Sequence, residues 1–366
     1  MKIVVTGLRG FPEMQGGIET HCEELYPRLI ERGDEIIVVR RKGFVKENPV
    51  RKVYKGIHFK DLYSPKITGL EAAIHTLLGV CYAYRIKADL VHIHAIGPAV
   101  VSPLAKLLGL KLVITHHGPD YDREKWGFIS RNVIKLGEYF TAKCADHIIA
   151  ISTVITDILK KKYNRERNVH LIFNGVTTMP SYPSTTSFLD EIGVQPQKYI
   201  LAVGRFVEEK RFDRLIEAFV QLNNPEYKLV IAGNADYESS YSLYLKNLAN
   251  ENHVILTGTV KGDKLHQLFS HAALFVLPSS HEGLPITLLE AMSFQRKVLA
   301  SDIPANLVVA LPEQCYFKLN DLSDLTEKLK EQLALPEQTR TYDLSKYNWN
   351  HIAEEVSAVY QQCLES

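Results

Sequence analysis

The chain has 366 residues, of which 46% are hydrophobic and 23% are charged, values typical of a soluble globular protein. This composition excludes a disordered, coiled-coil or collagen-like chain, and the length suits two domains of ~180 residues. No apolar run reaches the ~18 residues of a membrane-spanning helix, and the first residues resemble a buried strand rather than a signal peptide. The five cysteines are far apart and form no CxxC pair, which favours reduced thiols in the cytoplasm over disulfides or a zinc site.

The two halves of the chain carry opposite net charge. Residues 1–180 contain 27 Lys and Arg against 18 Asp and Glu, whereas residues 181–366 contain 16 against 24. The segment 40–66 is interpreted either as a solvated loop or as a surface for an anionic membrane or a phosphorylated acceptor, at about 1 kcal/mol per basic residue near a membrane. Nucleic acid is disfavoured as a partner, because no recognition helix or stacking aromatic residues accompany the charge. The basic residues of this segment are Arg40, Arg41, Lys42, Lys46, Arg51, Lys52, Lys55, Lys60 and Lys66.

Short apolar segments alternate with helical patterns through the first half of the chain. Strands that are apolar throughout belong to parallel sheets that helices cover on both faces. The predicted fold class is therefore α/β, with a doubly wound parallel sheet and right-handed crossovers. The strands are predicted at residues 3–6, 35–39, 90–93, 111–115 and 147–150, and the helices between them at residues 18–31, 70–84 and 131–143.

The alternation breaks at residues 176–196, which are rich in Ser, Thr and Pro, and then resumes. We predict two Rossmann-like domains that face each other across a central cleft, residues 1–176 and 198–345, joined by a linker at residues 177–197. A helix within residues 346–366 is expected to pack back on the first domain. The strands of the second domain are predicted at residues 199–203, 228–232, 254–257, 274–277 and 297–300.

Candidate site residues in the first half follow predicted strands, because parallel sheets bind ligands beyond the carboxyl ends of their strands. Gly16 and Gly17 precede a helix, where backbone N–H groups and the helix N-terminus can approach a phosphate; glycines that only permit the turn are the alternative. His116 follows the strand at 111–115 and is a candidate by position. Neither GxGxxG nor the Walker motif is present, which disfavours a nicotinamide enzyme or a P-loop enzyme.

Two cations follow the first strand of the second half. Gly204 and Arg205 come directly after residues 199–203, and Lys210 stands at the start of the next helical segment. A guanidinium and an ammonium at a strand–helix junction suit a pyrophosphate, because the arginine offers a fork of donors and the lysine a point charge.

A pair of carboxylates follows the strand at 274–277. Glu282 and Glu290 lie eight residues apart, about two helical turns, so both are predicted to face one ligand. Carboxylates are suitable acceptors for vicinal sugar hydroxyls. Glu290 lies in an apolar stretch where an unpaired charge would be costly, and Gly283 leaves backbone amides accessible near a helix N-terminus.

These motifs resemble the retaining glycosyltransferases of family 4, which have the GT-B fold. The resemblance rests on Gly204-Arg205 with Lys210, on the Glu282-x7-Glu290 pattern and on residues 174–176 (Asn-Gly-Val), and it extends over essentially the whole chain. The glycine-rich start and residues 123–127 are similar to a bacterial subgroup that contains rhamnosyltransferases and other enzymes of surface-polysaccharide assembly.

The resemblance implies a role for each candidate residue. Arg205 and Lys210 would bind the diphosphate of a nucleotide-sugar donor. Glu282 would bind hydroxyls of the transferred sugar and Glu290 those of the ribose, while His116 would contact the sugar near the bond that breaks. The other implied donor contacts are Gly16, Gly17, Gly204, Gly258, Lys261, Gly283, Leu284 and Pro285.

The sequence thus predicts a retaining, metal-independent glycosyltransferase. It would move a hexosyl or deoxyhexosyl unit from a nucleoside-diphosphate sugar to a hydroxyl of a glycan or lipid-linked saccharide, in bacterial surface-polysaccharide biosynthesis. No cofactor is expected besides this co-substrate, and the expected location is the cytoplasm, with peripheral attachment to the inner membrane face as a hypothesis. Two alternatives stay open: a sugar-nucleotide epimerase or hydrolase on the same fold, and a non-enzymatic sugar-binding or scaffold protein.

Overall fold

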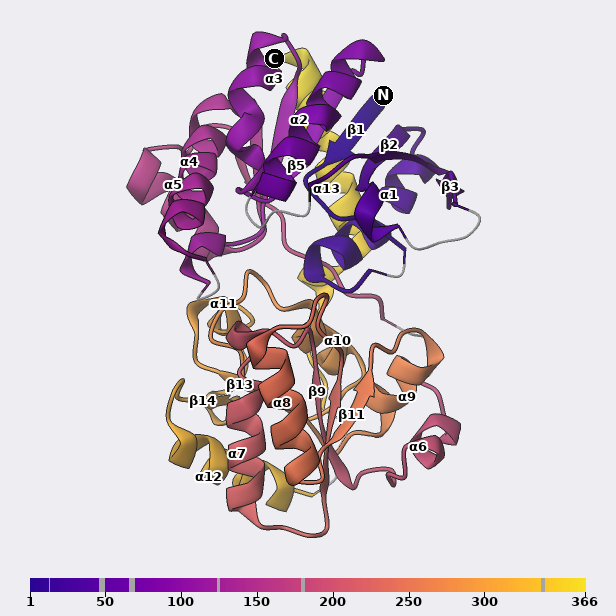
Figure 1. Ribbon diagram of the computed structural model, residues 1–366, viewed down its shortest axis with the longest axis vertical. Coiled ribbons are helices and arrows are strands. Elements are labelled where there is room, and N and C mark those ends of the chain that lie inside the picture. The colour runs from indigo at the N-terminus through magenta and orange to yellow at the C-terminus, as the bar shows by residue number, and fades with distance from the viewer. Residues whose placement is uncertain (13, 46–49, 66–69, 124–125, 179–181, 337–339) are drawn as a thin grey trace. The chain divides into compact units, whose positions relative to one another are not determined.

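Two α/β units account for the chain in the computed structural model, which describes residues 1–366 except 13, 46–49, 66–69, 124–125, 179–181 and 337–339 (Figure 1). One unit comprises Met1–Gly175 with Lys346–Ser366, and the other comprises Val176–Ser345. Some of the residues discussed above, namely Lys46 and Lys66 of the basic segment, residues 124–125 of the subgroup motif and residues 179–181 of the predicted linker, lie outside the described residues.

The first unit is built on an eight-stranded sheet in the order β3-β4-β2-β1-β5-β6-β7-β8. All its pairings are parallel except that of β3 with β4. The central strand β1 is apolar and almost wholly buried, as a strand covered on both faces must be. The strands are β1 (Lys2–Thr6), β2 (Glu35–Arg41), β3 (Val53–Tyr54), β4 (Ile57–Leu62), β5 (Leu90–His94), β6 (Leu112–His116), β7 (His147–Ala150) and β8 (Val169–Leu171).

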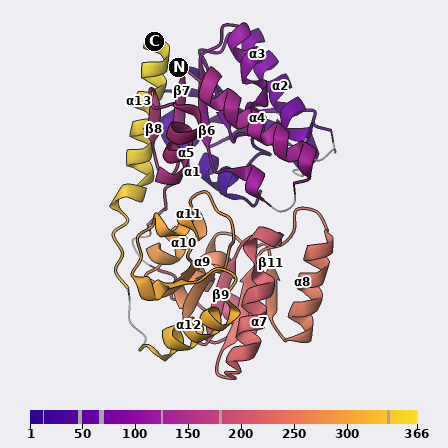
Figure 2. The ribbon, with the colours of Figure 1, turned by 90° about the vertical axis from the view of Figure 1, so that its left-hand side faces the viewer.

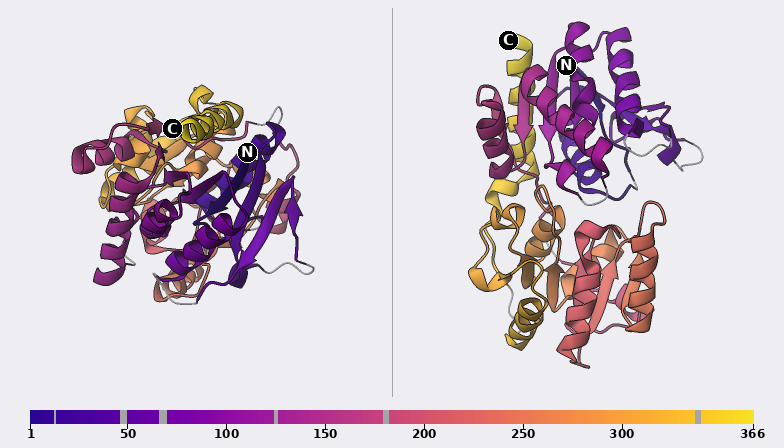
Figure 3. Two further views of the ribbon diagram at one scale, coloured as in Figure 1. Left: turned by 90° about the horizontal axis from the view of Figure 1, so that it is seen from above. Right: turned by 60° about the vertical axis from the view of Figure 1, so that its left-hand side comes forward.

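Helices cover both faces of this sheet. The C-terminal helix α13 packs against α1 and shares a hydrophobic core with β1 and β2, and Figure 2 shows it on the side of the sheet away from α2, α3 and α4. The same helix, in yellow, runs along the first unit in Figure 3. The elements are α1 (Gly17–Glu31), α2 (Leu70–Arg85), α3 (Ser102–Leu107), α4 (Phe128–Cys144), α5 (Thr153–Tyr163) and α13 (Trp349–Glu365), with short 3-10 turns η1 (Lys42–Phe44), η2 (Pro98–Val101), η3 (Asp120–Asp122) and η6 (Ser345–Tyr347).

The second unit holds a six-stranded parallel sheet in the order β11-β10-β9-β12-β13-β14. Its strands are β9 (Tyr199–Val203), β10 (Lys228–Ala232), β11 (Ile255–Gly258), β12 (Leu274–Leu277), β13 (Val298–Ser301) and β14 (Tyr316–Phe317). The helices are α6 (Ser187–Glu191), α7 (Phe212–Leu222), α8 (Ser240–Glu251), α9 (Asp263–His271), α10 (Ile286–Ser293), α11 (Pro304–Leu307) and α12 (Leu322–Ala334), with turns η4 (Glu208–Lys210) and η5 (Glu313–Cys315).

The α/β fold class with parallel sheets is confirmed, and strands β9, β10 and β12 occupy the residues predicted for them. The structure adds detail within residues 177–197, because residues 187–191 form α6, which contacts α9. Phe188 and Leu189 of α6 are buried, and the N–H of Phe188 donates to Oε1 of Gln267 at 2.9 Å. Of the helices in the described ranges, none combines the length and the apolar character needed to cross a bilayer.

Candidate active site

Loops that follow three neighbouring strands are joined at the carboxyl edge of the second sheet. The N–H of Gly204, just after β9, donates to the carbonyl of Ala232 at 2.9 Å, and the N–H of Gly233 donates to the carbonyl of Gly258 at 2.9 Å. Gly258 has a φ of +70°, a conformation that suits glycine. Two of the predicted donor contacts, Gly204 and Gly258, therefore lie at one edge of the sheet. Lys261 follows Gly258 and is exposed.

An ion pair joins the loop after β9 to the loop after β12. Nζ of Lys210 lies 2.5 Å from Oε1 of Glu282, and both side chains are nearly buried. A Cβ atom at Gly204 would lie 3.4 Å from Cε of Lys210, so the lysine passes over the glycine. The structure therefore brings Glu282 to Gly204 and Lys210, from which the sequence separates it by more than 70 positions.

Arg205 is held by a carboxylate that the sequence analysis did not identify. Its Nη1 donates to Oδ2 of Asp236 at 3.0 Å, and about a fifth of each side chain is exposed. Asp236 lies in the loop after β10, the neighbour of β9 in the sheet. Asp236 could have been identified from the sequence, because it is a carboxylate that closely follows the strand predicted at residues 228–232. The pair fixes the arginine while part of its surface still faces solvent.

The two glutamates do not lie on one helix, so the prediction that two helical turns separate them is wrong. Helix α10 begins at Ile286 with Pro285 as its N-cap, which places Glu282 in the preceding loop and Glu290 within the helix. The helix starts late because the prolyl ring of Pro285 disfavours a helical conformation at the residue before it. Gly283, Leu284 and Pro285 lead into the helix N-terminus, whose first N–H groups have no partner within the helix. Such a terminus is suited to an anion.

Gly16 and Gly17 play different parts at the start of α1. Gly16 has a φ of +154°, and a Cβ there would lie 2.6 Å from Nη2 of Arg9 and closer still to the Glu19 carboxylate. These two side chains form an ion pair of 3.0 Å that covers Gly16. Gly17 is exposed, and a Cβ there would meet no atom of the described chain within 4 Å. Packing therefore requires glycine at position 16 but not at position 17.

Gly17→Ala is expected to keep or slightly raise stability, because alanine favours a helix over glycine, and to lower activity if a substrate phosphate approaches this amide. Gly16→Ala is the matched control, and it should lower the thermal midpoint through the clash with Arg9 and Glu19. Thermal unfolding and initial rates of both variants give the check. Full activity of folded Gly17→Ala would leave the glycine with a turn-forming role only.

Both ring nitrogens of His116 are engaged by the protein. Its Nε2 lies 3.1 Å from Oε1 of Glu138, and its Nδ1 accepts the N–H of Gly118 at 3.2 Å. Because Nδ1 accepts, Nε2 carries the proton and donates to Glu138. The ring is fully buried, and this pairing gives it a role in holding the loop after β6 to α4.

Glu138 is an ionised carboxylate inside the first unit. Burial raises its pKa, but hydrogen bonds from His116, Lys162 and Tyr163 outweigh that effect and lower the pKa to about 2. Lys162 and Tyr163 each donate to Oε2 at 2.6 Å. A buried charge with this number of donors is fully compensated, so α4, α5 and β6 are joined at one point.

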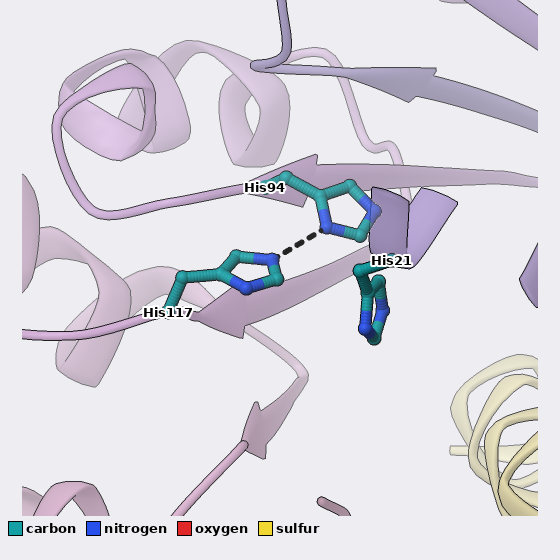
Figure 4. Close-up of side chains that lie close together, drawn as sticks. All are labelled: His21, His94 and His117. Atoms are coloured by element: carbon teal, nitrogen blue, oxygen red, sulfur yellow. Dashed lines mark hydrogen bonds between the residues drawn. The ribbon is translucent and has the colours of Figure 1, made fainter. Parts of the chain in front are cut away.

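The neighbour of His116, His117, belongs to a buried histidine cluster (Figure 4). Nδ1 of His94 and Nε2 of His117 form a hydrogen bond of 2.9 Å, and His21 packs edge-on against both rings. Burial lowers the pKa of His21 to about 4 and that of the other two well below the usual value. All three are therefore neutral at pH 7. The histidines at positions 92 and 94 of β5 and the pair at 116–117 were the signals in the sequence.

The cluster is better described as a hydrogen-bonded network than as a preformed metal centre. Each of the three histidines offers a nitrogen within 4.8 Å of the others, but Nδ1 of His94 and Nε2 of His117 are 2.9 Å apart in a hydrogen bond, closer than the about 3.3 Å between ligand atoms of a tetrahedral metal with bonds of 2.0–2.1 Å. His94 and His117 would have to give up their mutual hydrogen bond to bind an ion. The network continues through the hydroxyl of Tyr26, which contacts both His94 and His92.

The basic segment 40–66 contains both buried, ion-paired arginines and exposed cations. Arg40 is buried, pairs with Asp61 at 2.8 Å and lies over the ring of Phe59, and Arg41 pairs with Glu71 at 2.7 Å. These two arginines stabilise the edge of the sheet instead of facing a membrane. Among the described residues, the exposed cations of the segment are Lys42, Arg51, Lys52 and Lys55.

Comparisons with known proteins agree on the class of this chain. Residues 188–349 match the family described as "Glycosyl transferases group 1", and residues 15–179 match "Glycosyltransferase Family 4". An alpha-maltose-1-phosphate synthase of Mycolicibacterium smegmatis is 26% identical over 96% of both chains. Sucrose-phosphate synthase of Thermosynechococcus elongatus superimposes with a TM-score of 0.84 and 20% identity over 98% of both chains. HepE of Anabaena in complex with UDP-glucose superimposes with a TM-score of 0.73 and 18% identity, over 100% of this chain and 98% of its own.

The chain therefore belongs to the family 4 glycosyltransferases and has the GT-B fold. It is a glycosyltransferase. This identification confirms the resemblance found in the sequence, which rested on Arg205, Lys210 and the two glutamates.

Proposed function

We propose that this glycosyltransferase is a retaining enzyme that takes its sugar from a nucleoside diphosphate and needs no metal ion. The observation that carries the proposal is the group at the carboxyl edge of the second sheet, where Lys210 is oriented by Glu282 and Arg205 by Asp236. Two oriented cations can neutralise a diphosphate without a metal, because each forms charge-assisted hydrogen bonds with phosphate oxygens.

The protein's part in the reaction would be electrostatic. As the glycosidic bond breaks, negative charge develops on the leaving diphosphate, and Lys210, Arg205 and the N-terminus of α10 would stabilise it. The acceptor hydroxyl would attack on the face that the diphosphate leaves, and a diphosphate oxygen would take its proton. Glu282 would bind sugar hydroxyls and Glu290 ribose hydroxyls, the roles that the family resemblance implies.

A nucleotide sugar as donor is supported by the solved relative HepE, which was crystallised with UDP-glucose. We propose that the second unit binds this donor and that the first unit binds the acceptor, a glycan or lipid-linked saccharide. The open position at Gly17, at the N-terminus of α1, would approach a phosphate of a substrate. We also propose a role in bacterial surface-polysaccharide assembly, which the sequence resemblance supports.

A donor screen tests the proposal. Purified protein is incubated with UDP-, GDP- and dTDP-sugars with and without saccharide acceptors, and nucleoside diphosphate and glycoside are quantified. One donor should release nucleoside diphosphate in proportion to a new glycoside whose anomeric NMR coupling matches that of the donor, with equal rates in EDTA. Release without a glycoside, or conversion of the donor to an epimer, would support the hydrolase or epimerase alternative. Inversion or loss of activity in EDTA would refute the corresponding part of the proposal.

A further inference from the structure

Exposed apolar side chains are concentrated on three helices of the first unit. The described chain has 20 large hydrophobic residues that are well exposed, and nine of them lie on α2, α3 and α4. Phe128 and Ile129, at the start of α4, are 83% and 78% exposed, and Leu107 at the end of α3 is 83% exposed. We call this surface the apolar face; it comprises Leu70, Leu77, Leu78, Tyr84, Leu107, Phe128, Ile129, Leu136 and Tyr139.

The helices that carry the apolar face are neighbours in space. The turn η2 contacts both α2 and α4, and α3 contacts α4. Figure 2 shows the three helices together on the side of the sheet opposite α13. Their exposed apolar residues therefore belong to one side of the first unit. A monomeric soluble protein seldom exposes such a grouping without a partner.

The charge that accompanies the apolar face is positive. Arg85, Arg131, Lys135 and Lys143 are exposed on the same helices, as is Lys106, which pairs with Asp146 at 2.7 Å. Only two acidic residues occur on these helices, and both have partners: Glu71, about a fifth exposed, pairs with Arg41, and Glu138 is buried against His116, Lys162 and Tyr163. The three helices thus expose apolar and basic side chains, and their own two acidic residues are paired; this combination complements an anionic lipid surface.

We propose that α2, α3 and α4 form the surface by which this protein docks on an anionic lipid bilayer. Phe128, Ile129 and Leu107 would enter the interfacial region, where apolar and aromatic side chains replace water by acyl chains. Arg131 and Lys135, about one and two turns beyond Phe128 on α4, would bind lipid phosphates. The surface is distinct from the basic segment 40–66, two of whose arginines are internal.

The docking surface goes beyond the proposed function and can be tested without it. A lipid-linked acceptor would explain why a glycosyltransferase binds a membrane, but flotation measures binding and needs neither donor nor acceptor. A negative flotation result would therefore refute the docking surface and leave the transferase proposal untouched, whereas a failed donor screen would leave docking intact.

The test is flotation of the full chain with vesicles of phosphatidylcholine alone or mixed with phosphatidylglycerol. Wild type should float with the anionic vesicles and much less with the neutral ones, and binding should weaken with salt. Phe128→Ser with Ile129→Ser should lower the bound fraction about tenfold or more, since burial of the apolar face contributes most of the affinity. Arg131→Glu with Lys135→Glu should abolish the preference for anionic lipid.

Matched control variants test whether vesicle binding depends on the apolar face in particular. Leu243→Ser with Tyr244→Ser changes two exposed apolar residues of α8 in the other unit and should float like wild type. Lys52→Glu with Lys55→Glu tests the basic segment. The proposal fails if wild type does not float, if the Phe128 and Ile129 variant floats like wild type, or if the Lys52 and Lys55 variant alone abolishes binding. It also fails if the apolar face proves to be a contact between copies, which gel filtration of wild type and the α4 variant would reveal.

Discussion

Lys210→Ala is expected to lower kcat by about 10²–10³-fold, the usual cost of removing one group that stabilises developing negative charge. The lysine is suited to this role because Glu282 holds its ammonium at 2.5 Å, next to Gly204 and at the carboxyl edge of the sheet. Arg205→Ala should have an effect of the same order, since Asp236 orients the guanidinium at the same edge. Initial rates with the donor found by screening give the measurement.

Two controls separate catalysis from folding in this experiment. Lys198 is an exposed lysine of the same unit that pairs with Glu226, and Lys198→Ala should keep wild-type rates. Lys210→Ala leaves the nearly buried Glu282 without its cation, so a double variant with Glu282→Gln removes the unpaired charge and should recover stability but not turnover. Wild-type kcat in folded Lys210→Ala and Arg205→Ala would refute the assignment of this site.

The fold could be predicted from the sequence because its signal is local. Strand β9 is apolar throughout and β10 is apolar after Lys228, and both end at turn residues, so their type and bounds follow from short windows of sequence. The same logic placed Gly204 and Arg205 directly after a strand and Lys210 at the start of the next helical segment. Short edge elements such as β3 and β14, with two residues each, offer no comparable pattern, because sheet pairing rather than local preference forms them.

The contacts within the site could not be predicted, because they depend on which loops tertiary packing brings together. The pair of Lys210 with Glu282 joins residues separated by 72 positions, and nothing in the sequence matches one lysine to one glutamate. Arg40 stood in a basic run that suggested solvent, but a carboxylate on the adjacent strand, Asp61, draws it into the interior. His116 was selected for its position after a predicted strand, and the side-chain directions of His116 and His117 cannot be read from the local sequence.

The buried histidines of the first unit are expected to make its stability depend on pH. Burial holds the pKa of His21 at about 4 and that of His92 at about 3, against an ordinary value of 6.5. The unfolded chain therefore binds protons below about pH 6.5 that the folded chain does not bind. Their contribution to stability is complete above that pH and is lost as pH falls toward 4 and then 3. For His21 alone the difference corresponds to roughly 3 kcal/mol.

Glu138 extends the loss of stability to lower pH. Its pKa of about 2 in the folded state lies below the ordinary value of 4.5, so its contribution is present above pH 4.5 and is lost as pH falls toward 2. Because a domain is stable by only about 5–15 kcal/mol, the loss from the histidine cluster below pH 6.5 and the loss from Glu138 below pH 4.5 are together expected to unfold the first unit as the pH falls toward 3.

Tryptophan fluorescence can follow the first unit alone, since both tryptophans of the chain, Trp126 and Trp349, belong to it. Urea midpoints measured between pH 7.5 and 4.5 should fall steeply for wild type. His21→Asn keeps a neutral polar group beside Asn174. It should lower the number of protons taken up on unfolding by about one and so make the fall of the urea midpoint with pH less steep, whatever its effect at pH 7.5. His351→Asn changes an exposed histidine of the same unit and should leave the slope unchanged. A urea midpoint that stays constant from pH 7.5 to 4.5 would contradict the assignment of neutral, buried histidines.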